Sequence, residues 1–498
     1  MYTLGVDIGT FESKGVLVDF AGTIVAQATR GHQMIVPRAG WAEHRADQDW
    51  WGDFVFIVKK LLASCNVKPE QIKAVACSAI GPCMLPVDGQ GQPLINAVLY
   101  GVDTRASAEI DLLNAEVGAE VILTRCGNAL TSQSVGPKIL WFRRACPDLW
   151  ARTHKVMTAT TFLTHRLTGE YVIDHYTAAN FTPLYDISAQ DWCFDLGDIC
   201  ARDMLPRLMW SSEIAGAVTK AAALETGLAE GTPVTCGTID AAAEAVSVGA
   251  VAPGDMMMMY GSTIFIIQIT AERLGDARLW HAPWLYPGQH AAMAGLATSG
   301  TLTHWFRDQF ARDLPKDTAF AVLTAEAMDS PAGARGLLCL PYFSGERTPL
   351  HDPRARGAFF GLDLTHRRGD LYRAVLEGIA SATRHITDTY AEAGAVPVRV
   401  LAVGGGTKNR PWLQATSDLT GLDQVVARIT TGASFGDAYL AARAIGVAAE
   451  IDAWNPVDEV VTAVPHPAYA RQYPLFRALY VQTRDISAEL GSMQEVQR

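Results

Sequence analysis

The chain has 498 residues, and its 49% hydrophobic and 19% charged content is ordinary for a soluble globular enzyme. A chain of this length exceeds what one hydrophobic core usually supports, so we expect two large domains. The 41 basic residues stand against 52 acidic ones, and the net charge of −11 argues against a nucleic-acid or membrane-surface partner.

The first part of the chain predicts an antiparallel meander followed by alternating helices and strands. Strands are expected near residues 3–8, 14–19, 23–30 and 73–78. Helical patterns cover residues 48–63 and 104–150, whereas residues 158–212 look irregular, as in a lid or a substrate loop. This order predicts a mixed α/β sheet with helices on both faces.

The second part repeats the opening at the level of structure. A hairpin is expected at residues 255–270, and a strand at 398–403 ends in three glycines. Helices are expected at 369–393 and 434–446, and the glycine and proline residues around 248–255 mark a domain boundary. We therefore expect an N-terminal domain (1–247), a C-terminal domain (248–446) and a tail (447–498) that packs on the body.

The cysteine pattern and the N-terminus bear on the compartment. The nine cysteines include no C-x-x-C pair, which indicates free thiols in a reducing environment. The N-terminus enters a strand pattern without a signal-peptide core, and no stretch approaches the roughly 20 apolar residues of a membrane helix. We expect a cytoplasmic protein.

Two of the predicted hairpins have a turn that suits phosphate binding. The first turn contains Gly9 and Thr10, and the second is Gly261-Ser262-Thr263. Glycine lets the main chain approach a phosphate closely, and backbone N–H groups and a hydroxyl can then bind it. The pair predicts two related domains that hold one polyphosphate from opposite sides.

Two aspartates are candidates for the chemistry. Asp7, at the end of a strand, could hold a hydrated Mg²⁺ beside a phosphate, and its alternative role is to cap a turn. Asp240 lies where a strand becomes a helix, so it is either an ordinary N-cap or a base for an attacking hydroxyl. A helix N-terminus is expected to favour its ionised form and keep it a weak base. No Walker loop and no paired zinc-ligand spacing is present.

Taken in order, these elements resemble the FGGY family of carbohydrate kinases, within the actin-like and sugar-kinase ATPase superfamily. The resemblance runs from about Tyr2 to Ala442. It rests on Gly5 to Thr10, Gly40 to Glu43, Lys138 to Trp141, Asp240, Gly261 to Thr263, Leu340 to Pro349, Ala374 to Gly378, Gly404 to Gly406, and Ser434 to Ala438.

The resemblance implies two RNase H-like domains around a deep interdomain cleft, with the sugar on the first domain and ATP mostly on the second. It implies that Asp240 is the catalytic base and touches the substrate, and that Asp7 lies near Mg²⁺ and the γ-phosphate. The other implied nucleotide contacts are Thr10 and Lys14 near the γ-phosphate, Gly261, Ser262 and Thr263 at the phosphates, and Gly405, Gly406 and Asn409 at the adenosine.

Within the family, Ser344 to Pro349 and Lys138 to Trp141 look most like the xylulokinase branch. Asp103 and Arg105 lie where that branch has its acid-and-arginine sugar segment, which makes them candidate sugar contacts. Where xylulokinases carry a Met-His pair at the sugar, this chain has Gly81-Pro82, and a proline side chain cannot form that hydrogen bond. The identity of the preferred sugar therefore stays open.

The resulting hypothesis is an ATP- and Mg²⁺-dependent kinase that phosphorylates a terminal hydroxyl of a small ketose or polyol, with D-xylulose as the leading substrate. The alternatives are a tetritol, ribulose, gluconate or glycerol. The alternative from another class is an actin-like nucleotide switch, which would need neither Asp103 nor Asp240. The expected partners are the sugar and ATP, with a homodimer left open.

Overall fold

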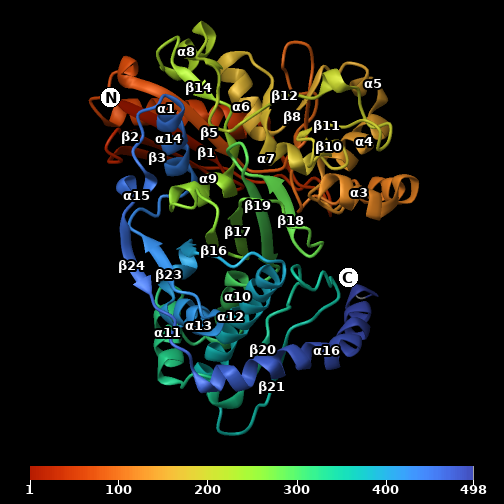
Figure 1. Cartoon of the computed structure of the whole chain (residues 1–498), viewed down its shortest axis with the longest axis vertical. Coiled ribbons are helices and arrows are strands. Elements are labelled where there is room, and N and C mark those ends of the chain that lie inside the picture. The colour runs from red at the N-terminus through yellow and green to blue at the C-terminus, as the bar shows by residue number, and fades with distance from the viewer. Residues whose placement is uncertain (497–498) are drawn as a thin grey trace. The chain divides into compact units, whose positions relative to one another are not determined.

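The computed structural model describes residues 1–496 and contains two compact units (Figure 1). The first unit comprises residues 1–251, 281–291 and 431–456, and the second comprises 252–280, 292–430 and the chain from 457 onward. Each unit contains a mixed sheet with helices packed against it. The predicted α/β class with two sheet-containing domains is confirmed.

The sheet of the first unit has the order β13-β14-β5-β1-β2-β3, and β15 also pairs with β5. Its strands are β1 (Tyr2–Ile8), β2 (Glu12–Asp19), β3 (Ile24–Gly31), β5 (Ile72–Ala79), β13 (Ile214–Ala217), β14 (Pro233–Thr235) and β15 (Thr238–Ile239). β1, β2 and β3 are antiparallel neighbours, whereas β5 is parallel to β1. The expected meander and the buried strand are confirmed.

Short strands and several helices complete this unit. The short strands are β4 (Glu43–His44), β6 (Leu85–Val87), β7 (Ala97–Val98), β8 (Lys155–Met157), β9 (Val172–Asp174), β10 (Tyr185–Asp186), β11 (Asp191–Trp192) and β12 (Arg207–Met209). The helices are α1 (Gly52–Ser64), α2 (Ser107–Leu113), α3 (Ala119–Cys126), α4 (Val135–Ala145), α5 (Pro147–Trp150), α6 (Ala159–Thr168), α7 (His175–Ala178), α8 (Lys220–Thr226), α9 (Asp240–Ser247), α14 (Ala433–Ala444) and α15 (Ile451–Trp454).

Two expectations for this unit are wrong in detail. Residues 104–150 are not one helical stretch, because the chain turns at Gly127, whose φ is 77°. Residues 158–212 are not wholly irregular, because they include α6. The Thr158 side chain caps the start of α6 by accepting a hydrogen bond from the Thr161 amide, and Gly169 ends it in the left-handed conformation.

Helix α14 packs on β1, β2 and β5 although it comes late in the chain, and Figure 1 shows it in blue beside the red strands. Small residues permit this close approach. A Cβ atom on Gly5 would lie only 1.9 Å from the carbonyl oxygen of Ser434. Ala74 and Ala76 of β5 form a buried cluster with Ala441 of α14. Leu4, Val6 and Ile8 alternate with Gly5 and fill the core on the other face.

The second unit contains a sheet of order β18-β19-β17-β16-β22-β23-β24, although residues 281–291, which include most of β18, group with the first unit. Its strands are β16 (Asp255–Tyr260), β17 (Ile264–Thr270), β18 (Trp280–Pro283), β19 (His290–Leu296), β22 (Arg399–Val403), β23 (Gln424–Ala427) and β24 (Val457–Val461), and a separate pair is β20 (Leu338–Leu340) and β21 (Ala358–Phe360). Its helices are α10 (Gly300–Phe310), α11 (Ala319–Asp329), α12 (Arg368–Glu392), α13 (Arg410–Thr420) and α16 (Pro467–Val496). The predicted hairpin and the strand before the three glycines are confirmed.

The chain divides differently from the expected linear scheme. Residues 431–456 belong to the first unit, because α14 packs on its sheet and on α9. The expected tail, 447–498, is also not a simple appendage. Its strand β24 pairs antiparallel with β23 and forms one edge of the second sheet, and α16 packs against α12 and α13. Within residues 1–496, no helix has the length and apolar character needed to cross a membrane.

Candidate active site

The first unit brings Asp7 and Asp240 together. Asp7 lies near the end of β1, Asp240 is the first residue of α9, and both side chains are partly exposed. Glu244 follows one turn later on α9. Burial raises the pKa of Asp7 well above its ordinary value, and the charges of Asp240 and Glu244 raise it further. Instead of capping a turn, Asp7 accepts a hydrogen bond from the Ser78 hydroxyl at 3.1 Å.

Asp240 does not cap α9, and its surroundings raise its pKa. The cap position of α9 is Ile239, and the Asp240 carboxylate accepts a hydrogen bond from the Ala241 amide at 2.7 Å. Burial and the charge of Glu244 raise the pKa of Asp240 to about 7 against this hydrogen bond. The expectation that the helix N-terminus keeps it a weak base is therefore wrong, because desolvation prevails. A base with a pKa near neutrality suits proton transfer at physiological pH.

Two histidines that sequence reasoning missed hold the turn after β1. His32 Nε2 lies 3.1 Å from the carbonyl oxygen of Gly9, and His44 Nε2 lies 3.1 Å from that of Thr10. The Trp50 indole donates to His44 Nδ1 at 3.1 Å, so His44 donates through Nε2. Burial lowers the pKa of His44 to about 4, which keeps it neutral. No local sequence pattern marks these two histidines, because only the folded chain brings them to the turn, from 23 and 34 residues further along the sequence.

Lys14 lies opposite Asp7 in the β1–β2 pair, and Thr10 follows in the turn after β1. The hydroxyl of Thr10 is 3.4 Å from that of Tyr100. Lys14 is the register partner of Asp7 in the β1–β2 pair, and its positive charge lowers the pKa of Asp7 and of Glu244. Lys14 therefore offsets part of the negative charge that these carboxylates share.

Asp103 and Arg105 are bound to each other rather than free for a ligand. The Arg105 guanidinium donates to both oxygens of Asp103, at 2.9 and 2.7 Å, and the Ala42 amide donates to the same carboxylate at 2.7 Å. The guanidinium lies 3.7 Å from the ring centre of Trp41 and 4.9 Å from that of Trp141. Since both side chains are almost fully buried, this geometry does not support direct contact with sugar hydroxyls and indicates a supporting role.

Gly81 and Pro82 follow β5 and border the start of α9. A Cβ atom on Gly81 would lie 2.7 Å from the side chain of Ile239, the residue before Asp240. Pro82 is buried at this place and offers no side-chain hydrogen bond. The structure therefore brings the segment that departs from the xylulokinase pattern next to the candidate base.

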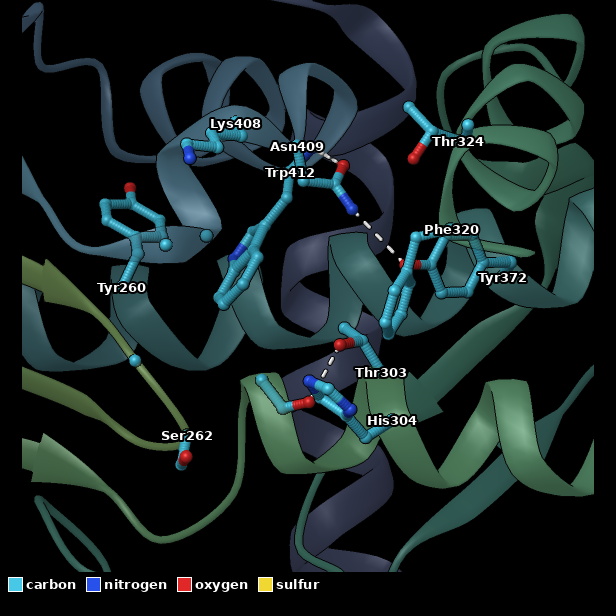
Figure 2. Close-up of a pocket in the computed structure, with 15 residues that line it drawn as sticks. Tyr260, Ser262, Thr303, His304, Phe320, Thr324, Tyr372, Lys408, Asn409 and Trp412 are labelled. Carbon is cyan, nitrogen blue, oxygen red and sulfur yellow. Dashed lines mark hydrogen bonds between the residues drawn. The ribbon is translucent and has the colours of Figure 1, made fainter. Parts of the chain in front are cut away.

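The second unit has a cavity of about 580 Å³ that five of the predicted nucleotide contacts line (Figure 2). These are Gly261, Ser262, Gly405, Gly406 and Asn409. Thr263 does not line it, and its carbonyl oxygen accepts a hydrogen bond from the Gly261 amide at 3.1 Å. A volume of this size is in the range of small-molecule sites.

Aromatic side chains that sequence reasoning missed form the walls of this cavity. Trp412 and Tyr260 meet edge to face with ring centres 5.1 Å apart, and Figure 2 shows Tyr372 and Phe320 on the other side. The Asn409 side chain accepts from the Trp412 amide at 3.3 Å and donates to the Tyr372 hydroxyl at 3.3 Å, so it fixes both walls. Such walls suit a flat ring.

The acids of the first unit fit a hydrated Mg²⁺. Among the described residues, no group of three or more His, Cys, Asp or Glu side chains has the arrangement of a metal site. Mg²⁺ needs only one or two carboxylates and keeps several waters. The charges of Asp240 and Glu244 raise the pKa of Asp7, and the charge of Glu244 raises that of Asp240, so a cation beside Asp7 would offset this negative charge. The donor set is therefore suitable for Mg²⁺.

Comparison with known proteins agrees with this geometry. Residues 2–247 match the model of the FGGY family of carbohydrate kinases, N-terminal domain, and residues 256–445 match that of the C-terminal domain. Xylulose kinase of Escherichia coli (strain K12) is 30% identical, covering 97% of this chain and 100% of its own. The crystal structure of xylulose kinase from Rhodospirillum rubrum is 32% identical with a TM-score of 0.91, covering 98% of this chain and 100% of its own.

Another relative has a different printed name. Gluconokinase of Bacillus subtilis (strain 168) is 25% identical, covering 96% of this chain and 95% of its own. The family models span most of the chain, and the full-length similarity to xylulose kinases agrees with them. The protein therefore belongs to the FGGY family of carbohydrate kinases and is an ATP-dependent sugar kinase.

Proposed function

We propose that this kinase transfers the γ-phosphoryl group of ATP to a terminal hydroxyl of a small ketose, with D-xylulose as the leading substrate and xylulose 5-phosphate as the product. Asp240 accepts the hydroxyl proton while the sugar oxygen bonds to the γ-phosphorus. The bond from that phosphorus to the β–γ bridging oxygen breaks, and ADP leaves. The observation that carries the proposal is a partly exposed Asp240 with its pKa raised to about 7 beside Asp7.

The other proposed roles follow from position. Gly261 and Ser262 bind phosphates through backbone N–H groups and a hydroxyl, and Gly405 and Asn409 border the adenosine. Thr263 stays a prediction at the phosphates. Thr10 and Lys14 of the first unit lie near the γ-phosphate. Asp7 would hold Mg²⁺, which would neutralise part of the phosphate charge when bound.

Gly405 allows a direct test of the nucleotide pocket. A Cβ atom there would meet nothing within 4 Å, so the fold should tolerate a larger residue that projects into the ligand space. We expect Gly405→Val to weaken ADP binding about tenfold or more, and Gly405→Ala to weaken it less. Calorimetric titration with ADP and a thermal melt of each variant measure this. Unchanged ADP affinity in the valine variant would contradict the placement of adenosine.

Evidence both for and against bears on the choice of D-xylulose. The full-length relatives named xylulose kinase favour a ketopentose. Against it, Pro82 offers no side-chain hydrogen bond next to Asp240, and the similarity to a gluconokinase makes a sugar acid the second candidate. Sites that bind substrate hydroxyls discriminate strongly against compounds that leave a polar group unpaired. A change in this one segment is therefore enough to alter the preference.

Substrate screening decides between these candidates. We expect ADP release to depend on added sugar, with D-xylulose giving the highest kcat/KM among D-xylulose, D-ribulose, tetritols, gluconate and glycerol. A maximum at gluconate would replace the substrate and keep the kinase. If no compound stimulated ADP release while ADP still bound, the proposed reaction would be wrong.

A further inference from the structure

Asp437 is a buried acid to which the proposed reaction gives no role. It lies on α14 and is 0% exposed. Its Oδ2 accepts a hydrogen bond from the Ser78 amide at 3.0 Å and lies 2.7 Å from Ser78 Oγ. Among the described residues, its Oδ1 has no hydrogen-bond partner. Removing an acid from water in this way is unfavourable, so its presence in a buried part of α14 calls for a reason.

A single residue, Ser78, lies between Asp437 and Asp7 and contacts both. Asp7 and Ser78 are register partners in the parallel pair of β1 and β5. Asp7 points to the same face of β1 as Gly5, the residue that α14 approaches. Ser78 Oγ lies 3.1 Å from Asp7 Oδ1. Three oxygen atoms therefore form a chain from Asp437 through Ser78 to Asp7.

The number of available protons decides which group donates in each of these two hydrogen bonds. Ser78 has one hydroxyl proton, but a carboxyl oxygen lies within hydrogen-bond distance on each side of it. Ser78 can donate its proton to only one of the two carboxyl groups. The other carboxyl group must therefore carry a proton of its own, because a lone pair of Ser78 Oγ would otherwise face a lone pair of that carboxyl oxygen. Asp437 is fully buried and Asp7 is partly exposed, so Asp437 holds the proton. Burial and the charge of Asp7 raise the pKa of Asp437 well above its ordinary value, in agreement.

We propose that Asp437 is a positioning residue of this kinase, which acts through Ser78 to fix the carboxylate of Asp7 for the metal ion. Neutral Asp437 donates to Ser78 Oγ, and Ser78 in turn donates to Asp7. The inference rests on the proposed function, in which Asp7 holds Mg²⁺. The hydrogen bond from Ser78 orders one Asp7 oxygen before the metal binds. Metal binding then loses less side-chain entropy, which favours a higher metal affinity.

Asp437→Asn tests this at constant volume. An amide oxygen at the Oδ2 position accepts from both the Ser78 amide and the Ser78 hydroxyl, which turns the hydroxyl proton away from Asp7. Partners of metal ligands typically change metal affinity by about 10- to 100-fold, and we expect about tenfold weaker Mn²⁺ binding. EPR of free Mn²⁺ in a titration of the protein with ADP present measures it. The Mg²⁺ concentration at half-maximal rate should rise by a similar factor.

A coupling measurement separates positioning from a merely structural role. Ser78→Ala should weaken Mn²⁺ binding by about the same factor, and the double variant should be no weaker than Ser78→Ala alone, since both residues act in one chain. Asp437→Ala removes the competing acceptor, so Ser78 can still donate to Asp7, and Mn²⁺ binding should weaken less than in Asp437→Asn. Unchanged Mn²⁺ binding in the folded Asp437→Asn variant, or fully additive effects of Asp437→Asn and Ser78→Ala, would overturn the proposal.

Ser434→Ala provides the matched control. Ser434 lies on the same helix, is 0% exposed, and its hydroxyl has no hydrogen-bond partner among the described residues. Its replacement should leave Mn²⁺ affinity within about twofold of the unmodified protein. The Mn²⁺ titration needs no sugar, so a failed substrate screen and a failed positioning role give different results.

Discussion

Asp240→Asn is expected to lower kcat by about 10²- to 10⁴-fold while leaving nucleotide affinity unchanged. The amide retains the size of the side chain and can still accept the hydrogen bond from Ala241, but it cannot take the proton of the attacking hydroxyl. The nucleotide pocket lies in the other compact unit and should not be affected. ADP release at saturating ATP and sugar gives kcat, and calorimetry gives ADP affinity. Turnover within about tenfold of the unmodified enzyme would reject Asp240 as the base.

The pH dependence of kcat/KM tests the assignment of Asp240 as the base in a protein that keeps this residue. Burial and Glu244 raise the pKa of Asp240 to about 7, so kcat/KM should fall as the pH is lowered through this value and the base takes up a proton. Glu244→Gln removes a like charge. It should lower the pKa of Asp240 and move the acid limb of kcat/KM to lower pH. An acid limb that stays in place would contradict the assignment of this titration to Asp240.

Gly436→Ala is expected to lower the free energy of unfolding by about 3 kcal/mol or more. A Cβ atom at this position would lie 1.9 Å from the carbonyl oxygen of Ala243 and 3.1 Å from the amide nitrogen of Ser247. These are backbone atoms of α9, so they cannot rotate away as a side chain could. Helix α14 would have to move from its place on the sheet.

Denaturant unfolding followed by circular dichroism measures this effect. Gly89→Ala is the matched control, because a Cβ atom there would meet nothing within 4 Å. Its free energy of unfolding should stay within about 1 kcal/mol of that of the unmodified protein. Equal free energies of unfolding for Gly436→Ala and Gly89→Ala would contradict the close packing of α14 against α9 at Gly436.

Local patterns predicted the hairpins well. The strands 2–8 and 255–260 follow from short apolar runs before a turn that contains glycine, and such signals act between neighbours in the chain. The error at α6 was avoidable, since Thr158 and Gly169 are ordinary start and stop signals. The edge strand β24 could not be foreseen, because its partner β23 is defined only by the fold.

In the candidate site, too, the residues beside local turns could be predicted and the contacts that folding makes could not. Asp7, Asp240 and Gly405 stand next to recognisable turns, so the sequence alone pointed to them. Asp437 lies within the family resemblance, but no local pattern marks it, because its contact with Ser78 joins segments 359 residues apart. The lowered pKa of His44 and the raised pKa of Asp240 depend on burial, which no local pattern reports. Asp103 is the opposite case, since its place in the sequence suggests a sugar contact, whereas in the fold its carboxylate is paired with Arg105.

The most direct test of the proposed reaction counts its products. The purified protein is incubated with ATP, Mg²⁺ and the sugar that gives the highest kcat/KM in the screen, and ADP and sugar phosphate are measured in the same sample. We predict one sugar monophosphate for each ADP released, and no ADP release above background without sugar. ADP release without formation of a sugar phosphate would contradict the assignment of this protein as a sugar kinase.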